Sequence, residues 1–445
     1  MKHPPGPLCK GDEIMYTKTE TNMKNQMKFR LIGMSFLQFA VWGAYLISMG
    51  TYLFGAGMGD KIGYFYAMQG VVALFMPALM GMVADRWVPA QKLLSGCHAL
   101  SALFKAGMGY VAMNAIASPA EEYPLLLMLY ALSLVFYMPT LALSNSVSYT
   151  ALERVKLNPV DSFPSIRLWG TVGFICAMIA TDVLGFQGSY MQFFLSAGLG
   201  LVASVYAYTL PSCPVSKRQQ GKKWTEILGF DAFSLFKQRK MAQFFLFSVL
   251  LGVALQITNG FANPFLNSFA SIPEYAETFG VKHANVLISL SQASETFCIL
   301  LIPFALKRWG IKRVMLIAML CWVLRFALFG WGNPGDGVWM FVLSMLVYGV
   351  AFDFFNISGS LFVNQETDMS IRSSAQGLFM MMTNGLGATI GTILAQQVVN
   401  HYVDFASPLP QIEGWSHAWF VFAGYMLVVA VLFAFIFKYK HQELK

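Results

Sequence analysis

The chain has 445 residues, of which 56% are hydrophobic and only 12% are charged. Soluble domains carry about 25% charged residues, so the composition argues against a soluble protein and indicates a polytopic membrane protein. The net charge of +8 could indicate nucleic-acid binding, but the basic residues gather in the loops of one expected membrane face and therefore indicate orientation.

Twelve stretches of the sequence are long and apolar enough to cross a bilayer as helices, which takes about 20 residues each. Backbone groups in lipid must pair internally, and runs of this length fit helices rather than barrel strands. We therefore expect an all-α protein with twelve transmembrane helices, at approximately 31–54, 62–83, 93–115, 124–149, 166–187, 189–210, 241–268, 284–305, 313–331, 338–362, 373–399 and 415–437.

A polar interruption at 211–240 divides these stretches into two sets of six. Within it, the spacing of apolar residues in 224–236 predicts an amphipathic helix at the membrane interface. The expected organisation is a cytoplasmic N-terminal tail, a six-helix half, a cytoplasmic linker, a second six-helix half and a short cytoplasmic tail, at 1–30, 31–210, 211–240, 241–437 and 438–445. Most Lys and Arg residues lie in the two tails, the linker and loops on their side, which predicts that both termini are cytoplasmic.

The two halves share a short loop motif. Arg86-Trp87 follows the second stretch of the first half, and Arg308-Trp309 follows the second stretch of the second half. Related six-helix halves around an axis along the membrane normal are typical of the major facilitator superfamily. The loop before Arg86 also resembles that superfamily's signature, with Gly81 four residues before Asp85, although Pro89 stands where a later glycine is usual.

Polar side chains in three apolar stretches are the strongest functional signal. Gln256 and Asn259 lie in one stretch, Gln292 and Glu295 in the next, and Asp353 in 338–362. Such groups at bilayer depth are costly unless they have partners or line a watery cavity. A single amide is explained as well by a hydrogen bond between helices, worth about 1 kcal/mol. Two neighbouring pairs indicate instead a pocket for a small hydrogen-bonding solute.

Helical spacing places further residues beside this pocket. Arg167, Thr171 and Phe174 repeat at i, i+4 and i+7, and Tyr348 and Phe352 repeat at i and i+4. Gln38, Trp42 and Tyr45 follow the same spacing in 31–54, although aromatic stripes more often pack or face lipid. Lys105 and Arg325 also lie within stretches, and we assign them no role.

The sequence has no Walker loop, HExxH motif or nucleophile elbow, and its scattered cysteines form no metal-ligand spacing. We expect a transporter rather than an enzyme, with no cofactor and no metal. Without an ATP-binding module, uphill transport must use an ion gradient, and Glu295 or Asp353 could bind and release the proton. Arg167 is the candidate cationic partner.

Several segments resemble one family, the bacterial nucleoside:proton symporters of the major facilitator superfamily. The similarity covers residues 28–441 and is carried by FPSIRLWGTVGF (163–174), LQITN (255–259), SQASETF (291–297), AFDFFNISGS (351–360) and SAQGLFMMMTNG (374–385). It implies a monomeric, twelve-helix carrier of the inner membrane that takes up purine and pyrimidine nucleosides, such as uridine and adenosine, with a proton.

Carried over residue by residue, the resemblance places substrate contacts at Arg167, Thr171, Phe174, Gln256, Asn259, Gln292, Glu295, Tyr348 and Phe352. It assigns coupling or conformational change to Asp353, while Glu295 is a proton-coupling candidate because it is a carboxylate within an apolar stretch. The polar N-terminal extension and Lys105 have no counterpart in the resemblance.

The residue chemistry suits a neutral nucleoside. Amide side chains offer a donor and an acceptor to a base edge, and aromatic rings stack on any base. A proton-coupled sugar carrier remains an alternative, because amide and carboxylate groups also suit pyranoses. A membrane sensor that binds nucleosides without transporting them is the alternative from another class. The residues alone do not distinguish proton from sodium coupling.

Overall fold

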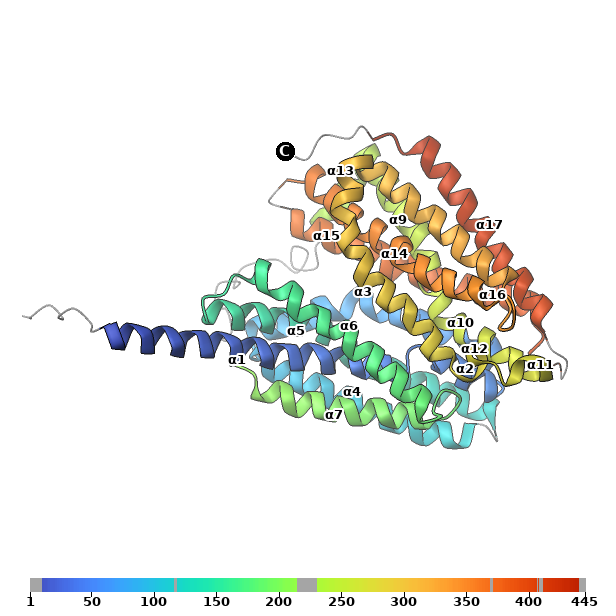
Figure 1. The fold of residues 1–445 in the computed structure, drawn as a ribbon, viewed down its shortest axis with the longest axis horizontal. Coiled ribbons are helices and arrows are strands. Elements are labelled where there is room, and N and C mark those ends of the chain that lie inside the picture. The colour runs from blue at the N-terminus through green and yellow to red at the C-terminus, as the bar shows by residue number, and fades with distance from the viewer. Residues whose placement is uncertain are drawn as a thin grey trace, which may run out of the picture.

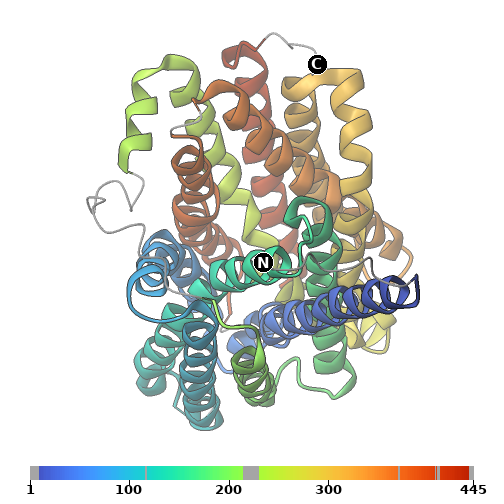
Figure 2. The same ribbon diagram turned by 90° about the vertical axis from the view of Figure 1, so that its left-hand side faces the viewer.

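The computed structural model describes residues 10–115, 118–213, 230–368, 371–405, 407 and 411–439. Within these ranges every regular element is a helix, which confirms the all-α prediction. The helices form two groups that meet along one interface (Figure 1). Figure 2 shows the same division from a second direction, with the blue and green helices on one side and the yellow to red helices on the other.

The N-terminal helical group comprises the first part of the chain up to residue 209. Its helix α4 packs against α5 and α7, and α1 packs against α6 and α7. The elements are α1 (Lys10–Gly43), α2 (Met49–Gly55), the 3-10 turn η1 (Gly59–Lys61), α3 (Ile62–Arg86), α4 (Ala90–Ala115), α5 (Pro119–Arg154), α6 (Pro159–Val183) and α7 (Met191–Thr209).

The C-terminal helical group follows from residue 230. Its longest helix, α13, packs against α14 and α17. The elements are η3 (Phe230–Lys237), α9 (Arg239–Leu255), α10 (Ile257–Ser268), η4 (Phe269–Ser271), α11 (Pro273–Ala276), α12 (Phe279–Lys282), α13 (Ala284–Trp331), α14 (Val338–Glu366), α15 (Arg372–Met380), the π-helical segment η5 (Met381–Gly387), α16 (Ala388–Tyr402) and α17 (Ile412–Ile436).

Nine helical segments of the described chain are long and apolar enough to cross a membrane. One of them, α13, contains two of the expected crossings, 284–305 and 313–331. It is interrupted at Gly310, whose φ of 73° lies in the left-handed region that glycine adopts without strain. The second Arg-Trp motif therefore lies beside a sharp break between two helices, just as the first lies at the end of α3.

Two expected helices are not continuous. The stretch 31–54 breaks after Gly43 and resumes at Met49, so Tyr45 lies in the turn and does not extend the helical stripe of Gln38 and Trp42. The stretch 241–268 breaks at Gln256, between α9 and α10. The residues 44–48 form a turn in the first stretch. At the second break Gln256 keeps a helical conformation, and its carbonyl accepts a 3.1 Å hydrogen bond from the Gly260 amide, so the spacing of Gln256 and Asn259 is preserved.

Most of the linker lies outside the described residues, since 214–229 are not described. The amphipathic helix expected at 224–236 falls partly there. Its described end is the 3-10 helix η3, which packs on α9. The rings of Phe236 and Phe245 lie 5.2 Å apart, centre to centre, and the Leu235 side chain is buried. This end of the linker is therefore anchored to the C-terminal helical group.

The two helical groups touch through a few helix pairs. Helix α2 contacts α10, α3 contacts α16 and η5, and α6 contacts α13. The side chain of Gln396 on α16 accepts a hydrogen bond from the Gly63 amide and donates one of 3.0 Å to the Gly59 carbonyl. These contacts set the relative position of the side chains that the two groups direct toward their interface.

Candidate functional site

An aromatic pair on α14 forms one wall of the candidate site. The rings of Tyr348 and Phe352 are stacked, with centres 5.5 Å apart and planes 18° from parallel. The Tyr348 hydroxyl hydrogen-bonds with the Gln292 side chain of α13. Because α13 packs along α14, the i, i+4 spacing of the two aromatic residues becomes a flat surface beside an amide. Such a surface can stack on a planar base and hydrogen-bond to its edge.

Two carboxylates lie close to this wall. Glu295 is half-buried on α13 and Asp353 is buried on α14. They interact electrostatically with each other. One carboxylate oxygen of Asp353, Oδ2, is buried with no hydrogen-bond partner among the described residues. An unpaired buried carboxylate oxygen is costly while it carries a charge, so this site favours a group that can take up a proton.

Arg167 contributes to the site from the N-terminal helical group. Its guanidinium lies over the ring of Phe39, 3.8 Å from the ring centre, and interacts electrostatically with Glu295. Arg167 belongs to α6 and Glu295 to α13, and these two helices are in contact. The candidate cation and carboxylate identified in the sequence are thus near each other across the interface between the groups.

Phe174 and Thr171 extend the α6 side of the site. Phe174 is buried, and its ring meets that of Trp42 edge-on at 6.5 Å between centres. Trp42 in turn lies 5.9 Å from the ring of Tyr137. Thr171 is half-buried one turn before Phe174. These aromatic rings support one another, which fixes the apolar part of the N-terminal side.

Gln256 and Asn259 lie at the helix break between α9 and α10. The Asn259 side-chain amide donates a 2.9 Å hydrogen bond to Gln256 Oε1, and both residues are half-buried. An amide has more donors and acceptors than one such bond uses, so the pair can still bind a polar ligand. Asn263, which shares their spacing in the sequence, instead belongs to a separate polar cluster.

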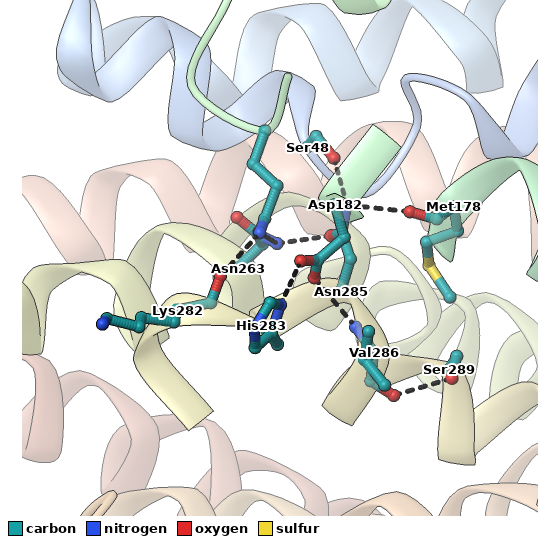
Figure 3. Close-up of polar contacts among 10 residues, drawn as sticks. Ser48, Met178, Asp182, Asn263, Lys282, His283, Asn285, Val286 and Ser289 are labelled. Carbon is teal, nitrogen blue, oxygen red and sulfur yellow. Dashed lines mark hydrogen bonds and ion pairs between the residues drawn. The ribbon is translucent and has the colours of Figure 1, made fainter. Parts of the chain in front are cut away.

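This second cluster, which we call the interface network, was not found in the sequence (Figure 3). Its carboxylate–imidazole pair joins the end of α6 to the start of α13. The Asp182 carboxylate lies 2.8 Å from His283 Nδ1 and accepts a 3.1 Å hydrogen bond from the Val286 backbone amide. The Asp182 side chain is fully buried, whereas 43% of the His283 side chain is exposed.

Three amides complete the interface network. The Asn285 side chain donates to Ser48 Oγ at 2.6 Å and accepts from Asn263 at 2.6 Å. Asn263 also donates to Gln187 at 3.2 Å. Gln187 in turn donates to the Lys282 carbonyl at 3.2 Å. The network therefore links the two helical groups through charge-assisted and amide hydrogen bonds. The polar residues at the ends of the stretches were its only sequence signal.

Polar and aromatic side chains that two helical groups direct toward one shared interface are typical of membrane transporters. The sequence model of the nucleoside H+ symporter family matches residues 23–442. The chain belongs to this family, which makes it a transporter of nucleosides with protons and not an enzyme. The similarity predicted from the sequence motifs is confirmed.

Individual relatives agree over nearly the whole chain. The nucleoside permease NupG of Escherichia coli (strain K12) is 46% identical over 94% of this chain and 97% of its own. The xanthosine permease of the same organism is also 46% identical, over 94% and 97%. The crystal structure of nucleoside transporter NupG superimposes with a TM-score of 0.84 at 45% identity, covering 93% of this chain and 100% of that one.

Proposed function

We propose that the protein takes up purine and pyrimidine nucleosides with a proton by alternating access, binding the substrate between its two helical groups. The observation that carries the proposal is the approach of Arg167 to Glu295 across the interface, beside the stacked rings of Tyr348 and Phe352. Residues from both groups then contact one substrate, and binding is coupled to movement of the groups.

The proposed membrane arrangement is the major facilitator fold, with twelve transmembrane helices in two six-helix halves. Nine segments in the described part of the chain meet the requirements for a crossing. Helix α13 supplies two crossings because it breaks at Gly310. The helical stretches 31–54 and 93–115 supply the other two. The excess of Lys and Arg on one side supports a cytoplasmic location for both termini, and we propose a monomer in the bacterial inner membrane.

Each part of a nucleoside has a proposed partner. Tyr348 and Phe352 stack on the base, and Gln256, Asn259 and Gln292 hydrogen-bond to its edge. Glu295 accepts hydrogen bonds from the ribose hydroxyls. Arg167, Thr171 and Phe174 complete the site from α6. Because stacking does not discriminate among bases, the arrangement supports a carrier with a broad nucleoside range.

Proton coupling is assigned to Glu295 and Asp353. We expect Glu295→Gln or Asp353→Asn to abolish accumulation of nucleoside against a gradient, and to reduce equilibrium exchange less. The reason is that exchange requires binding and conformational change, whereas accumulation also requires the proton to be carried. Normal accumulation by both variants would refute this assignment.

The interface network supports alternating access. It joins α6 and the segment before α2 to α10, α12 and α13 (Figure 3). In the proposed mechanism these bonds close one face of the interface in the present conformation. They must break before the substrate can reach the site from that face.

The test of the proposed function is uptake of labelled uridine, adenosine and xanthosine by cells that lack their own nucleoside carriers. Xanthosine is included because the xanthosine permease of Escherichia coli is as similar to this chain as NupG is, at 46% identity. We expect saturable uptake that a protonophore abolishes and an excess of glucose does not inhibit. Binding of nucleosides without uptake would support a sensor, and inhibition by sugars alone would support a sugar carrier.

A further inference from the structure

A buried arginine lies behind the aromatic wall of the site. The Arg325 side chain on α13 is only 2% exposed. Among the described residues it forms no ion pair with a carboxylate. An unpaired charge at this depth is costly, and an apolar side chain of similar volume would fill the same space with less penalty. Packing alone therefore does not explain an arginine at this position.

Hydrogen bonds to α14 fix the Arg325 guanidinium. Its Nη1 donates a 2.6 Å hydrogen bond to the Ser344 carbonyl and lies 3.4 Å from Ser291 Oγ. In return, the Ser344 hydroxyl donates a 3.1 Å hydrogen bond to the Arg325 carbonyl. The first bond ties the guanidinium to α14, and the second ties the α13 backbone at Arg325 to the same residue of α14.

The Arg325 guanidinium faces the ring of Tyr348, with Cζ 4.6 Å from the ring centre. The Tyr348 ring also meets Trp322 edge-on at 5.9 Å and stacks with Phe352 at 5.5 Å. The Tyr348 hydroxyl hydrogen-bonds with Gln292. Arg325 thus contacts the one residue that connects the stacking surface to an amide of the site.

We propose that Arg325 is a positioning residue for nucleoside binding. It holds the Tyr348 ring, and through that ring Phe352 and Gln292, in the arrangement that accepts the base. This inference rests on the proposed function of the same site. A cation over an aromatic face in a water-poor environment restricts the ring's tilt, and a preorganised ring loses less conformational freedom when the ligand binds.

The test is a double-mutant cycle on uridine binding to the purified full-length protein. The variants are Arg325→Met, Tyr348→Leu and the double variant. We expect Arg325→Met to raise the Kd for uridine about 3- to 30-fold, the range of a desolvated cation–π contact. In the Tyr348→Leu background the same substitution should have little further effect, because the ring that Arg325 positions is absent.

A matched control is Lys105→Met. Lys105 is also a buried cation against tyrosine rings, 3.6 Å from the ring centre of Tyr45, but it lies on α4 in the other helical group. Its Kd for uridine should stay at the wild-type value. The proposal is overturned if Arg325→Met binds uridine like the wild type. It is also overturned if Arg325→Met weakens binding by the same factor with and without the Tyr348 ring, which is the result of a purely structural role.

If Arg325→Met does not fold, Arg325→Lys replaces it in the cycle. Lysine keeps the charge but lacks the planar group, so we expect a Kd raised severalfold in the presence of Tyr348 and unchanged in its absence. Wild-type binding by a folded Arg325→Lys variant would overturn the role of the guanidinium. Failure of the proposed function gives a different result, namely no uridine binding by the wild type or full binding by Tyr348→Leu.

Discussion

Replacing Asp182 by Asn is expected to open the interface network without unfolding the protein. The Asp182 carboxylate is fully buried, and it accepts hydrogen bonds from His283 at 2.8 Å and from the Val286 amide at 3.1 Å. Asparagine has nearly the same shape, but it carries no charge. The substitution therefore removes the charge-assisted part of both bonds and leaves the packing of α6 intact.

The size of the effect follows from these contacts. Hydrogen bonds to charged groups contribute about 1.5–3 kcal/mol. Because 43% of the His283 side chain is exposed, solvent screens the pair and the lower end of this range applies. A loss of about 1.4 kcal/mol changes an equilibrium tenfold. We therefore expect the population in which this face is open to rise about tenfold.

Amide hydrogen exchange in the detergent-solubilised protein measures this population. Exchange should accelerate at residues 48–55, which comprise Ser48 and all of α2. Among the described residues, the hydrogen bonds of the Asp182 side chain go to His283 and Val286 and not to this segment, so faster exchange there reports opening rather than a local change. Glu277→Gln is the matched control. Glu277 forms an ion pair with Lys282 close to His283, but its side chain is 81% exposed, and exposed pairs contribute little. Unchanged exchange at 48–55 in Asp182→Asn would refute the reasoning.

Two further predictions concern binding and helix packing. Gln256→Ala and Gln292→Ala should each raise the Kd for nucleosides about 3- to 10-fold, the loss expected for one neutral hydrogen bond; unchanged affinity in a direct binding assay would remove that residue from the site. Gly252→Ala should lower the thermal unfolding temperature, because the added Cβ would lie 3.0 Å from the Cα of Gly387. Gly424→Ala, with no neighbour within 4 Å of the added Cβ, should not lower it, and equal melting of the two variants would contradict the close packing of α9 and η5.

Apolar length was sufficient to predict that the fold is helical and where most helices lie. It could not predict the helix interruptions after Gly43 and at Gln256, because hydropathy carries no information about local backbone conformation. At the second break, the amide of Gly260 still donates to the Gln256 carbonyl at 3.1 Å. The interruption at Gln256 therefore leaves both this helical hydrogen bond and the apolar pattern of the stretch unaltered.

The candidate site shows the same limit. The stacking of Tyr348 and Phe352 follows from their spacing on one helix, so the sequence was enough to place them together. The proximity of Arg167 and Glu295 depends on how α6 packs against α13, and sequence spacing could only name them as candidates. Asp182 and His283 are 101 positions apart. Each lies near the end of an apolar stretch, where polar residues are common, so the sequence does not indicate that they pair. Their pairing is a property of the assembled interface.

The position of Arg167 and Glu295 on opposite helical groups gives a physical basis for the proposed coupling. Their attraction exists only while α6 and α13 hold them near each other. A proton on Glu295 cancels the negative charge and with it this attraction, so protonation changes the relative free energies of conformations in which the groups are together or apart. A nucleoside whose ribose hydroxyls bind Glu295 acts on the same group. In the proposed mechanism, proton and substrate therefore bias one conformational equilibrium through one carboxylate. Glu295→Gln should reduce the pH dependence of that equilibrium, measured as exchange at residues 48–55 after correction for the pH dependence of intrinsic amide exchange.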